Sequence, residues 1–300
     1  MDQKTRKDRR RRNSRVGVPP VSCFCLLALA AVSGFGCAHM PYRLGAIRED
    51  EHTLRLRPEE PQIEVGRKVA FVDGLGHYVV SLPSKLLLWN WRVDNHNISP
   101  GTIAHLRQYL HANGLHNVKV RVNQYAPGRE WSRLFRNQAV SAPWRYTLGV
   151  VSVAMYTIMP GRVFGGDHYN PYTNTINLYS DVAAIAVHEG AHAKDFAGRS
   201  RGFRGFYAFV RGLPLVPLVQ EAFATGDTVG YYRAHNLTED EKAAYKILYP
   251  AYGTYVGGEF LQLAPSNRVP GILVTYAAAL PGHLIGRIKS LFVPDRPGRE

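Results

Sequence analysis

The feature that most constrains this chain is residues 188–192, which read His-Glu-Gly-Ala-His. On a helix, residues four positions apart share a face, so both imidazoles can reach one metal ion. Glu189 follows the first histidine directly, where it can take a proton from water at an open coordination position. The pattern predicts a helix that carries two Zn²⁺ ligands and a general base. We expect Ser180 or Asp181 as its N-cap and Gly198 as its end.

The alternative is a solvated or structural histidine pair that binds no metal. The turn before the motif is apolar (Ala184, Ile185, Val187), which predicts a buried helix. Two histidines and a glutamate side by side in a core are hard to satisfy without a metal. We therefore expect a true metal site, preceded by a strand at residues 173–179.

A catalytic zinc needs three protein ligands and one open position. Glu221 is the strongest candidate for the third ligand, because it lies on its own predicted helix among apolar residues, where a carboxylate needs a partner. Asp195, Asp227 and Glu259 are the alternatives. Asp195 shares a helix face with both histidines, but three ligands from one short helix converge poorly. We expect Asp195, like Asp227, to orient a ligand from outside the metal's coordination shell or to be a surface ion.

At this point residues 163–235 resemble the gluzincin class of zinc metallopeptidases, in which a His-Glu-x-x-His helix is followed by a second helix with a ligand glutamate. The resemblance implies a peptide or protein substrate and a strand, here residues 174–179, that pairs with it at a sheet edge. It also implies the roles of four residues, with His188, His192 and Glu221 as ligands and Glu189 as base.

The chain departs from the gluzincin pattern in one position. Many gluzincins place an acidic residue four positions after the ligand glutamate, and Thr225 stands there in this chain. The transition state also needs a hydrogen-bond donor for its oxyanion. Tyr231, Tyr232 and His235, on or just beyond the Glu221 helix, are candidates, and each is also open to a structural role.

The first 36 residues have the pattern of an export signal, with a basic stretch followed by a short apolar run rich in small residues. Gly34 and Gly36 before Cys37 predict a lipoprotein signal, with Cys37 lipidated. Plain cleavage, or an uncleaved anchor or basic tail, are the alternatives. We expect an exported protein that is lipid-anchored in a bacterial cell envelope, in the outer membrane. Cleavage would leave one cysteine for the lipid, so His, Glu or Asp must hold the zinc.

The whole chain carries a net charge of +14, of which residues 1–36 contribute +6 (eight Lys or Arg and two Asp), so the mature chain carries about +8. This charge favours anionic surfaces such as lipid headgroups or cell-wall polymers. We expect no nucleic-acid partner, because the chain has no binding motif and is predicted to be exported. Residues 37–62 are read as a tether and residues 63–300 as one domain. The fold class is α+β, with a zincin-like small sheet on the motif helix (residues 63–198) and a mostly helical C-terminal part (residues 199–300).

Three further patterns give local expectations. Residues 118–122 alternate, which predicts a strand whose Lys119 and Arg121 lie on a half-exposed face. The apolar residues 78–91 are expected in the core, with a membrane-surface anchor as the alternative. Residues 251–263 and 272–291 are apolar and rich in small residues, which favours close helix packing over membrane contact.

Three functional hypotheses follow. The first is a zinc metallopeptidase that cleaves envelope proteins or peptides. The second is a non-catalytic envelope lipoprotein whose structural or vestigial metal site serves a binding or scaffold module. The presence of Glu189 argues against it, because a purely structural site needs no general base. The third is an integral-membrane protease with its site near the bilayer.

Overall fold

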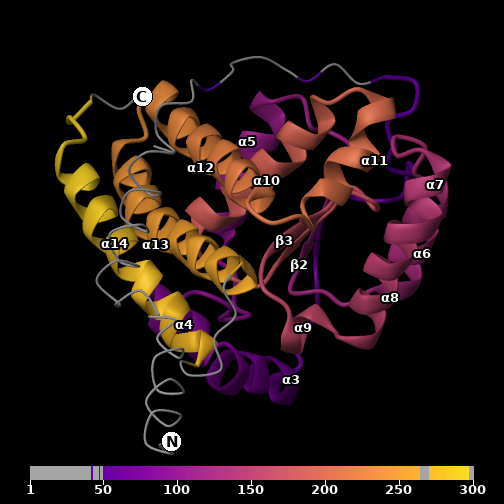
Figure 1. The fold of residues 1–300 in the computed structure, drawn as a ribbon. Helices are drawn as coiled ribbons and strands as arrows, with labels where there is room; N and C mark the ends of the chain where they lie inside the picture. The colour runs from indigo at the N-terminus through magenta and orange to yellow at the C-terminus, as the bar shows by residue number, and fades with distance from the viewer. Residues whose placement is uncertain (1–41, 43–46, 48–49, 264–269, 297–300) are drawn as a thin grey trace, which may run out of the picture.

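The computed structural model describes residues 42 and 47, residues 50–263 and residues 270–296 (Figure 1). The predicted leader and Cys37 lie outside these residues. The strands are β1 (Ile63–Val65), β2 (Lys119–Val122), β3 (His168–Asn170) and β4 (Thr175–Leu178). The helices before the motif are α3 (Ala70–Leu75), the π-helix η1 (Gly76–Val80), α4 (Leu82–Leu88), α5 (Pro100–Ala112), α6 (Pro127–Arg136), α7 (Ala142–Trp144), the π-helix η2 (Arg145–Gly149), α8 (Val150–Ile158) and α9 (Gly161–Phe164). Those that follow are α10 (Ala183–Ala197), α11 (Arg201–Val210), α12 (Val216–Ala234), α13 (Thr238–Leu263) and α14 (Gly271–Leu291).

The class is α+β, as expected, with one small mixed sheet among the described residues. Its strand order is β1-β2-β4-β3, in which β1, β2 and β4 are parallel and β3 runs antiparallel to β4. The predicted strand at 173–179 is confirmed as β4. It lies between β2 and β3, so the expectation that it is an edge strand open to a peptide is wrong. The edges of the described sheet are β1 and β3.

One face of the sheet forms the main core with the motif helix. Val120 and Val122 of β2 and Ile176 and Leu178 of β4 are buried there together with residues of α5, α10, α12 and α13. This alternation follows from the two-residue period of a strand, which sends every second side chain to the same face. The motif helix α10 therefore lies in the middle of the molecule, between the sheet and the C-terminal helices (Figure 1).

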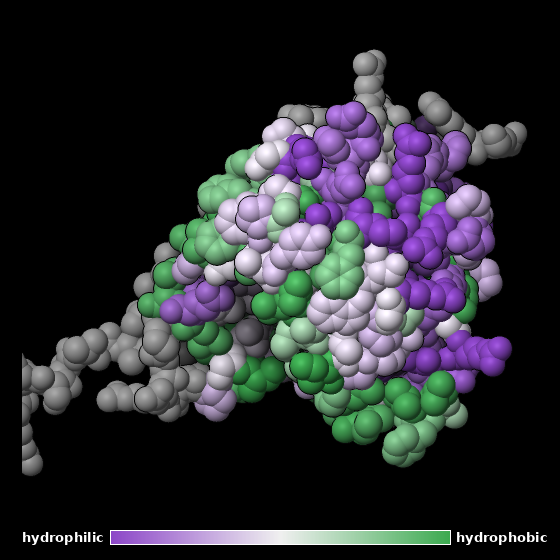
Figure 2. Space-filling view, turned by 90° about the vertical axis from the view of Figure 1, so that its right-hand side faces the viewer, coloured by the Kyte–Doolittle hydropathy of each residue, from purple (hydrophilic) through white to green (hydrophobic). Residues whose placement is uncertain are grey.

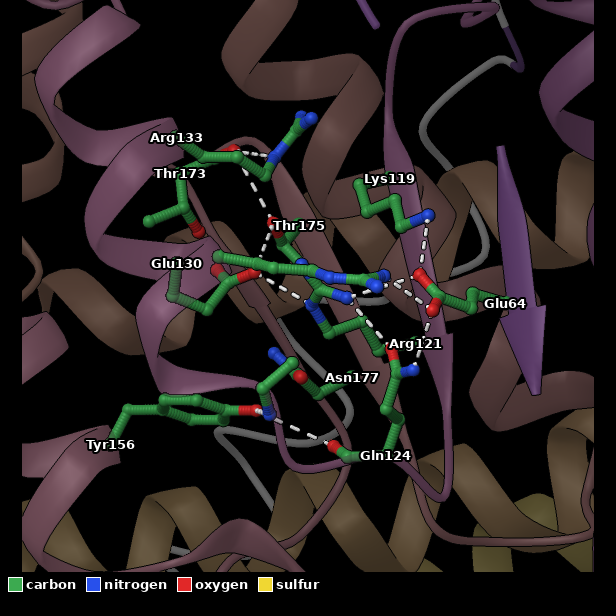
Figure 3. Close-up of polar contacts among 12 residues, drawn as sticks. Glu64, Lys119, Arg121, Gln124, Glu130, Arg133, Tyr156, Thr173, Thr175 and Asn177 are labelled. Carbon is green, nitrogen blue, oxygen red and sulfur yellow. Dashed lines mark hydrogen bonds and ion pairs between the residues drawn. The ribbon is translucent and has the colours of Figure 1, made fainter. Parts of the chain in front are cut away.

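The opposite face of the sheet is polar but is not exposed, which corrects the expectation for Lys119 and Arg121. Both side chains are fully buried because α6 covers this face (Figure 3). Arg121 donates from Nε to Glu130 Oε1 of α6 at 2.7 Å, and Lys119 Nζ lies 3.0 Å from Glu64 Oε2 of β1. Each buried cation is thus paired with a carboxylate, as burial of a charge requires.

The start of α10 differs from the capping prediction, while its end at Gly198 agrees with it. The residue before the helix is Val182, and it makes no side-chain cap. Asp181 instead accepts hydrogen bonds from Ser99 and Thr102 at the start of α5. Burial raises the pKa of Asp181, but these hydrogen bonds outweigh burial and lower the pKa to about 2. The carboxylate therefore ties α5 to the segment that leads into α10.

The C-terminal helices pack closely, as the small residues predict. Both α13 and α14 continue through their internal prolines, Pro250 and Pro281. A Cβ atom added to Gly257 of α13 would lie 3.0 Å from the Ala278 Cβ atom of α14. One added to Gly253 would overlap the Ala278 carbonyl, so glycine is needed for this approach.

Residues 78–91 do not form the core that their composition predicts. Tyr78 is 69% exposed and Trp89 58% exposed, whereas the polar residues Ser81 and Lys85 are buried. Figure 2 shows hydrophobic residues gathered at the lower edge of the molecule, below a largely hydrophilic surface. The lower edge in Figure 1 carries α3 and α9.

The described residues of the predicted tether pack against the domain. Leu54 is buried, and Glu60 lies 3.1 Å from the guanidinium of Arg133 on α6. Tyr42 receives a cation–π contact from Lys194 of α10, with 3.9 Å between Nζ and the ring centroid.

Candidate metal centre

The side chains of α10 and α12 meet in the interior of the molecule and bring together the three predicted ligands. His188 Nε2 lies 2.9 Å from Glu221 Oε2, and His192 Nε2 lies 3.3 Å from Glu221 Oε1. The two imidazole Nε2 atoms are 3.1 Å apart. All three ligand atoms lie within 4.8 Å of one another, so one ion can contact them together.

The centre is buried, and a close approach of helices shapes it. Glu221 is 2% exposed, His188 8% and Glu189 7%. Gly190, between the two histidines, faces Tyr109 of α5, and a Cβ atom there would lie 2.7 Å from the Tyr109 ring. The glycine in the middle of the motif therefore allows α10 to rest on α5.

The charges of the centre keep Glu221 ionised. Burial alone raises the pKa of this carboxyl, but the charge of His192 and the hydrogen bonds of both histidines outweigh burial and hold the pKa well below its ordinary value. Burial lowers the pKa of His188, whereas its hydrogen bond to Glu221 and the charge of that carboxylate raise it, and the net shift is upward. A carboxylate that stays ionised beside two imidazoles is a donor set suited to a divalent cation.

Two residues at the centre are not found by sequence reasoning. Arg211, which follows α11, donates from Nη2 to Glu221 Oε1 at 2.5 Å and from Nη1 to Gln220 Oε1 at 3.1 Å. Tyr255 of α13 shares a hydrogen bond with Glu221, whose charge, together with burial, raises the pKa of the phenol. The basic, aromatic character of residues 199–211 was the available signal for Arg211. The sequence offered no such signal for Tyr255, because only the packing of α13 brings this residue to the metal centre.

The rival acidic residues lie elsewhere and have other partners. Asp195 pairs with Arg199 at 2.5 Å, and Asp227 pairs with Lys194 at 2.6 Å. These contacts do not include a candidate ligand, so the prediction that Asp195 and Asp227 orient one finds no support in them. Glu259 accepts a hydrogen bond from the Leu215 backbone N–H at 2.6 Å, which fixes the loop before α12.

Thr225 stands where many gluzincins have an acidic residue, and His188 correspondingly lacks a hydrogen bond at one ring nitrogen. Nδ1 of His188 is buried and has no hydrogen-bond partner among the described residues. Thr225 is buried on α12, one turn after Glu221. Among the described residues, no carboxylate therefore orients His188 through Nδ1, and its polar contacts with Glu221 and His192 are both made through Nε2.

The three predicted transition-state donors lie away from the candidate ligands. Tyr231 packs edge-on against Tyr109, with 4.9 Å between ring centroids, and its ring lies tilted against that of His235, with 4.3 Å between centroids. Tyr232 is fully buried beside His105. Ten residues of helix separate Tyr231 from Glu221, a rise of about 15 Å. The structure does not bring these side chains to the centre, and their contacts are those of core residues.

Comparisons with known protein families, with curated proteins and with solved structures find no match to this chain.

Proposed function

We propose that the protein is a zinc-dependent metallopeptidase of the gluzincin type, which hydrolyses peptide bonds of proteins or peptides. The observation that carries the proposal is the convergence of His188, His192 and Glu221, from two helices, on a region that one ion can fill. Glu189 adds the general base, in the position next to the first ligand. A purely structural site would need the three ligands only.

The donor set fits zinc in its chemistry. Two imidazole nitrogens and one carboxylate leave a fourth position open, as catalytic zinc sites require. Arg211 binds Glu221 Oε1, but a carboxylate has about four lone-pair sites, so the carboxylate retains acceptor capacity. A bound zinc ion would supply Lewis acidity, which lowers the pKa of a water molecule and polarises a carbonyl group.

The protein's own residues would then do the rest of the chemistry. Glu189 accepts the proton of the attacking water and passes it to the departing amine. Arg211 and Tyr255 both reach Glu221, one of the three residues that would hold the metal, so they are the donors nearest to a substrate oxygen that the metal would polarise. We assign them the donor role that Tyr231, Tyr232 and His235 are too distant to fill.

Export and lipid anchoring at Cys37 complete the proposal. They rest on the basic and apolar pattern of residues 1–36 and place the enzyme in the cell envelope, with envelope proteins or peptides as substrates. The zincin-like arrangement of sheet and motif helix is part of the same proposal.

The test is the Glu189→Gln variant, assayed on unfolded casein with the zinc content measured in parallel. We expect zinc to remain and hydrolysis to fall by at least about 10²-fold, because the ligands stay while the base is lost. Asp195→Asn is the matched control, since it changes a carboxylate on the same helix that pairs with Arg199. Undiminished hydrolysis by Glu189→Gln would refute the mechanism. Zinc binding without hydrolysis in the unmodified protein would favour the scaffold hypothesis.

A further inference from the structure

One side of the molecule presents an apolar surface made by α4 and α14, which lie side by side in Figure 1. We call this surface the α4–α14 face. Its members are hydrophobic side chains that are 38% to 58% exposed, namely Leu82, Leu86, Trp89, Leu273, Leu280, Leu284 and Ile288. It continues at the end of α14 into Leu291 and Phe292, which are 82% and 80% exposed. Single exposed apolar residues are normal, but so many along two neighbouring helices are not.

On the α4–α14 face, apolar side chains point outward and a charged side chain is buried, which is the reverse of an ordinary water-exposed surface. Lys85 is the one buried residue of α4, and it donates to the Asp94 carbonyl oxygen at 3.1 Å, while Leu82 and Leu86 point outward. On α14, Leu280, Leu284 and Ile288 recur every four residues, so they form a stripe along one side of the helix. Both helices thus turn apolar side chains outward.

The reversed arrangement is held by specific contacts between the two helices. The Nε2 atom of His283 on α14 lies 2.8 Å from the Leu87 carbonyl oxygen. The His283 ring stacks on the Trp89 ring, with 3.8 Å between their centroids. Arg287 lies over the same Trp89 ring, with 4.7 Å between its Cζ atom and the ring centroid. The opposite side of α14 packs closely against α13. The outward side chains are therefore fixed in place by their neighbours.

The charges on these segments match an anionic surface. Apart from the buried Lys85, and Arg296, which pairs with Glu241, residues 66–92 and 270–296 carry five cations against two carboxylates. The cations are Arg67, Lys68, Arg92, Arg287 and Lys289, and the carboxylates are Asp73 and Asp295. A cavity of about 520 Å³ opens beside the face, with Arg92, Lys246 and Arg287 in its lining together with Asp181 and Asp240. Apolar side chains bordered by Trp, Lys and Arg are typical of segments that lie at a membrane interface.

We propose that the α4–α14 face rests on a lipid bilayer with anionic headgroups, in a contact that does not depend on a lipid at Cys37. Of the described helices, α14 is long and apolar enough to cross a membrane, and 33% of that stretch is buried. Because its inner side is occupied by α13, α14 lies along the interface with its outer stripe in the acyl region. The proposal does not rest on the metal centre.

The test is co-sedimentation of residues 38–300 with vesicles of phosphatidylethanolamine and phosphatidylglycerol. This chain contains every described residue and lacks both the leader and Cys37. We expect binding that weakens as salt rises. The double variant Leu280→Glu with Leu284→Glu should bind about thirtyfold more weakly, since two half-exposed leucines leave the acyl region.

The matched control is Val151→Glu with Met155→Glu, an equally spaced pair on α8 that is 58% and 49% exposed on the other side of the molecule. It should bind vesicles like the unmodified chain. Circular dichroism and thermal unfolding check that both variants fold. The proposal is overturned if the unmodified chain stays in the supernatant, or if both double variants lose binding equally. It is also overturned if the unmodified chain is a dimer that Leu280→Glu with Leu284→Glu dissociates, because a second copy would then cover the face.

Discussion

Replacement of Gly190 by alanine tests the close approach of α10 and α5 that shapes the candidate metal centre. In a helix interior, alanine is more favourable than glycine by about 1 kcal/mol. At this position, however, the new Cβ atom would lie 2.7 Å from Cδ1 and 2.9 Å from Cε1 of Tyr109. Overpacking of this kind costs about 1–3 kcal/mol. The gain and the cost oppose each other, so we expect Gly190→Ala to destabilise the fold by up to about 2 kcal/mol.

The Tyr109 ring has little freedom to move away. It is fully buried, and its hydroxyl donates to Asp227, which in turn pairs with Lys194 of α10 at 2.6 Å. The overlap between the new Cβ atom and Tyr109 must therefore be removed by a shift of α10 itself. Such a shift would also displace the two histidines and weaken zinc binding.

Gly258→Ala is the control, because Gly258 is also inside a helix and a Cβ atom there meets nothing within 4 Å. It should stabilise the protein by up to about 1 kcal/mol. Urea unfolding of the two variants isolates the cost of overlap, since the helix propensity term is common to both. Equal stabilisation by both substitutions would refute the reasoning.

Three further predictions use separate parts of the structure. Burial, reinforced by the charge of Asp167, raises the pKa of Asp94 to about 7. The folded protein therefore holds this proton more tightly than the unfolded chain does. The protonated Asp94 carboxyl contributes its full stability below about pH 4, and this contribution is lost as the pH rises through 7. In urea unfolding, Asp94→Asn should remove up to about 4 kcal/mol of the change in unfolding free energy over this pH range. An unchanged dependence of unfolding free energy on pH would contradict the prediction. Glu130→Ala removes the carboxylate 2.7 Å from Nε of the buried Arg121, and leaves Glu64 and Gln124 on Nη1 only. It should cost about 3 kcal/mol in guanidinium unfolding, whereas loss of the largely exposed Arg129 should cost less than about 1 kcal/mol. Similar losses of stability from Glu130→Ala and from loss of Arg129 would contradict the claim that the buried Arg121–Glu130 pair matters more than the exposed one. Arg211→Ala should keep zinc and lower kcat/KM for casein cleavage by about 10²–10³-fold, and full activity would exclude the donor role.

The elements that could be predicted are those with local signals. The motif helix and its end at Gly198 follow from spacing and a single glycine. Glu221 was found because an acidic residue among apolar neighbours needs a partner. In each case the information lies within one or two turns of the residue concerned.

The parts that could not be predicted depend on which element covers or approaches another. Alternation placed Lys119 and Arg121 correctly on one face of β2, but it could not show that α6 would cover that face. Asp181 was expected to cap α10, but its carboxylate accepts hydrogen bonds from Ser99 and Thr102 at the start of α5 instead. Arg211 and Tyr255 reach the centre only through the packing of α11 and α13.

The interpretation of residues 78–91 failed for a related reason. Apolar composition indicates that side chains avoid water, but it does not say whether protein or lipid replaces the water. The exposure of Trp89 and the burial of Lys85 are properties of the folded arrangement and leave no mark in composition.

The most direct test of the central claim is the zinc content of purified residues 38–300, measured for the unmodified chain, for Glu221→Ala and for Glu259→Ala. Both glutamates are buried, at 2% and 4% exposure, but only Glu221 lies with the two histidines. We expect about one zinc ion per chain in the unmodified protein and in Glu259→Ala, and loss or great weakening of binding in Glu221→Ala. No zinc in the folded, unmodified chain after zinc is supplied, or equal zinc in all three, would contradict the His188, His192 and Glu221 centre.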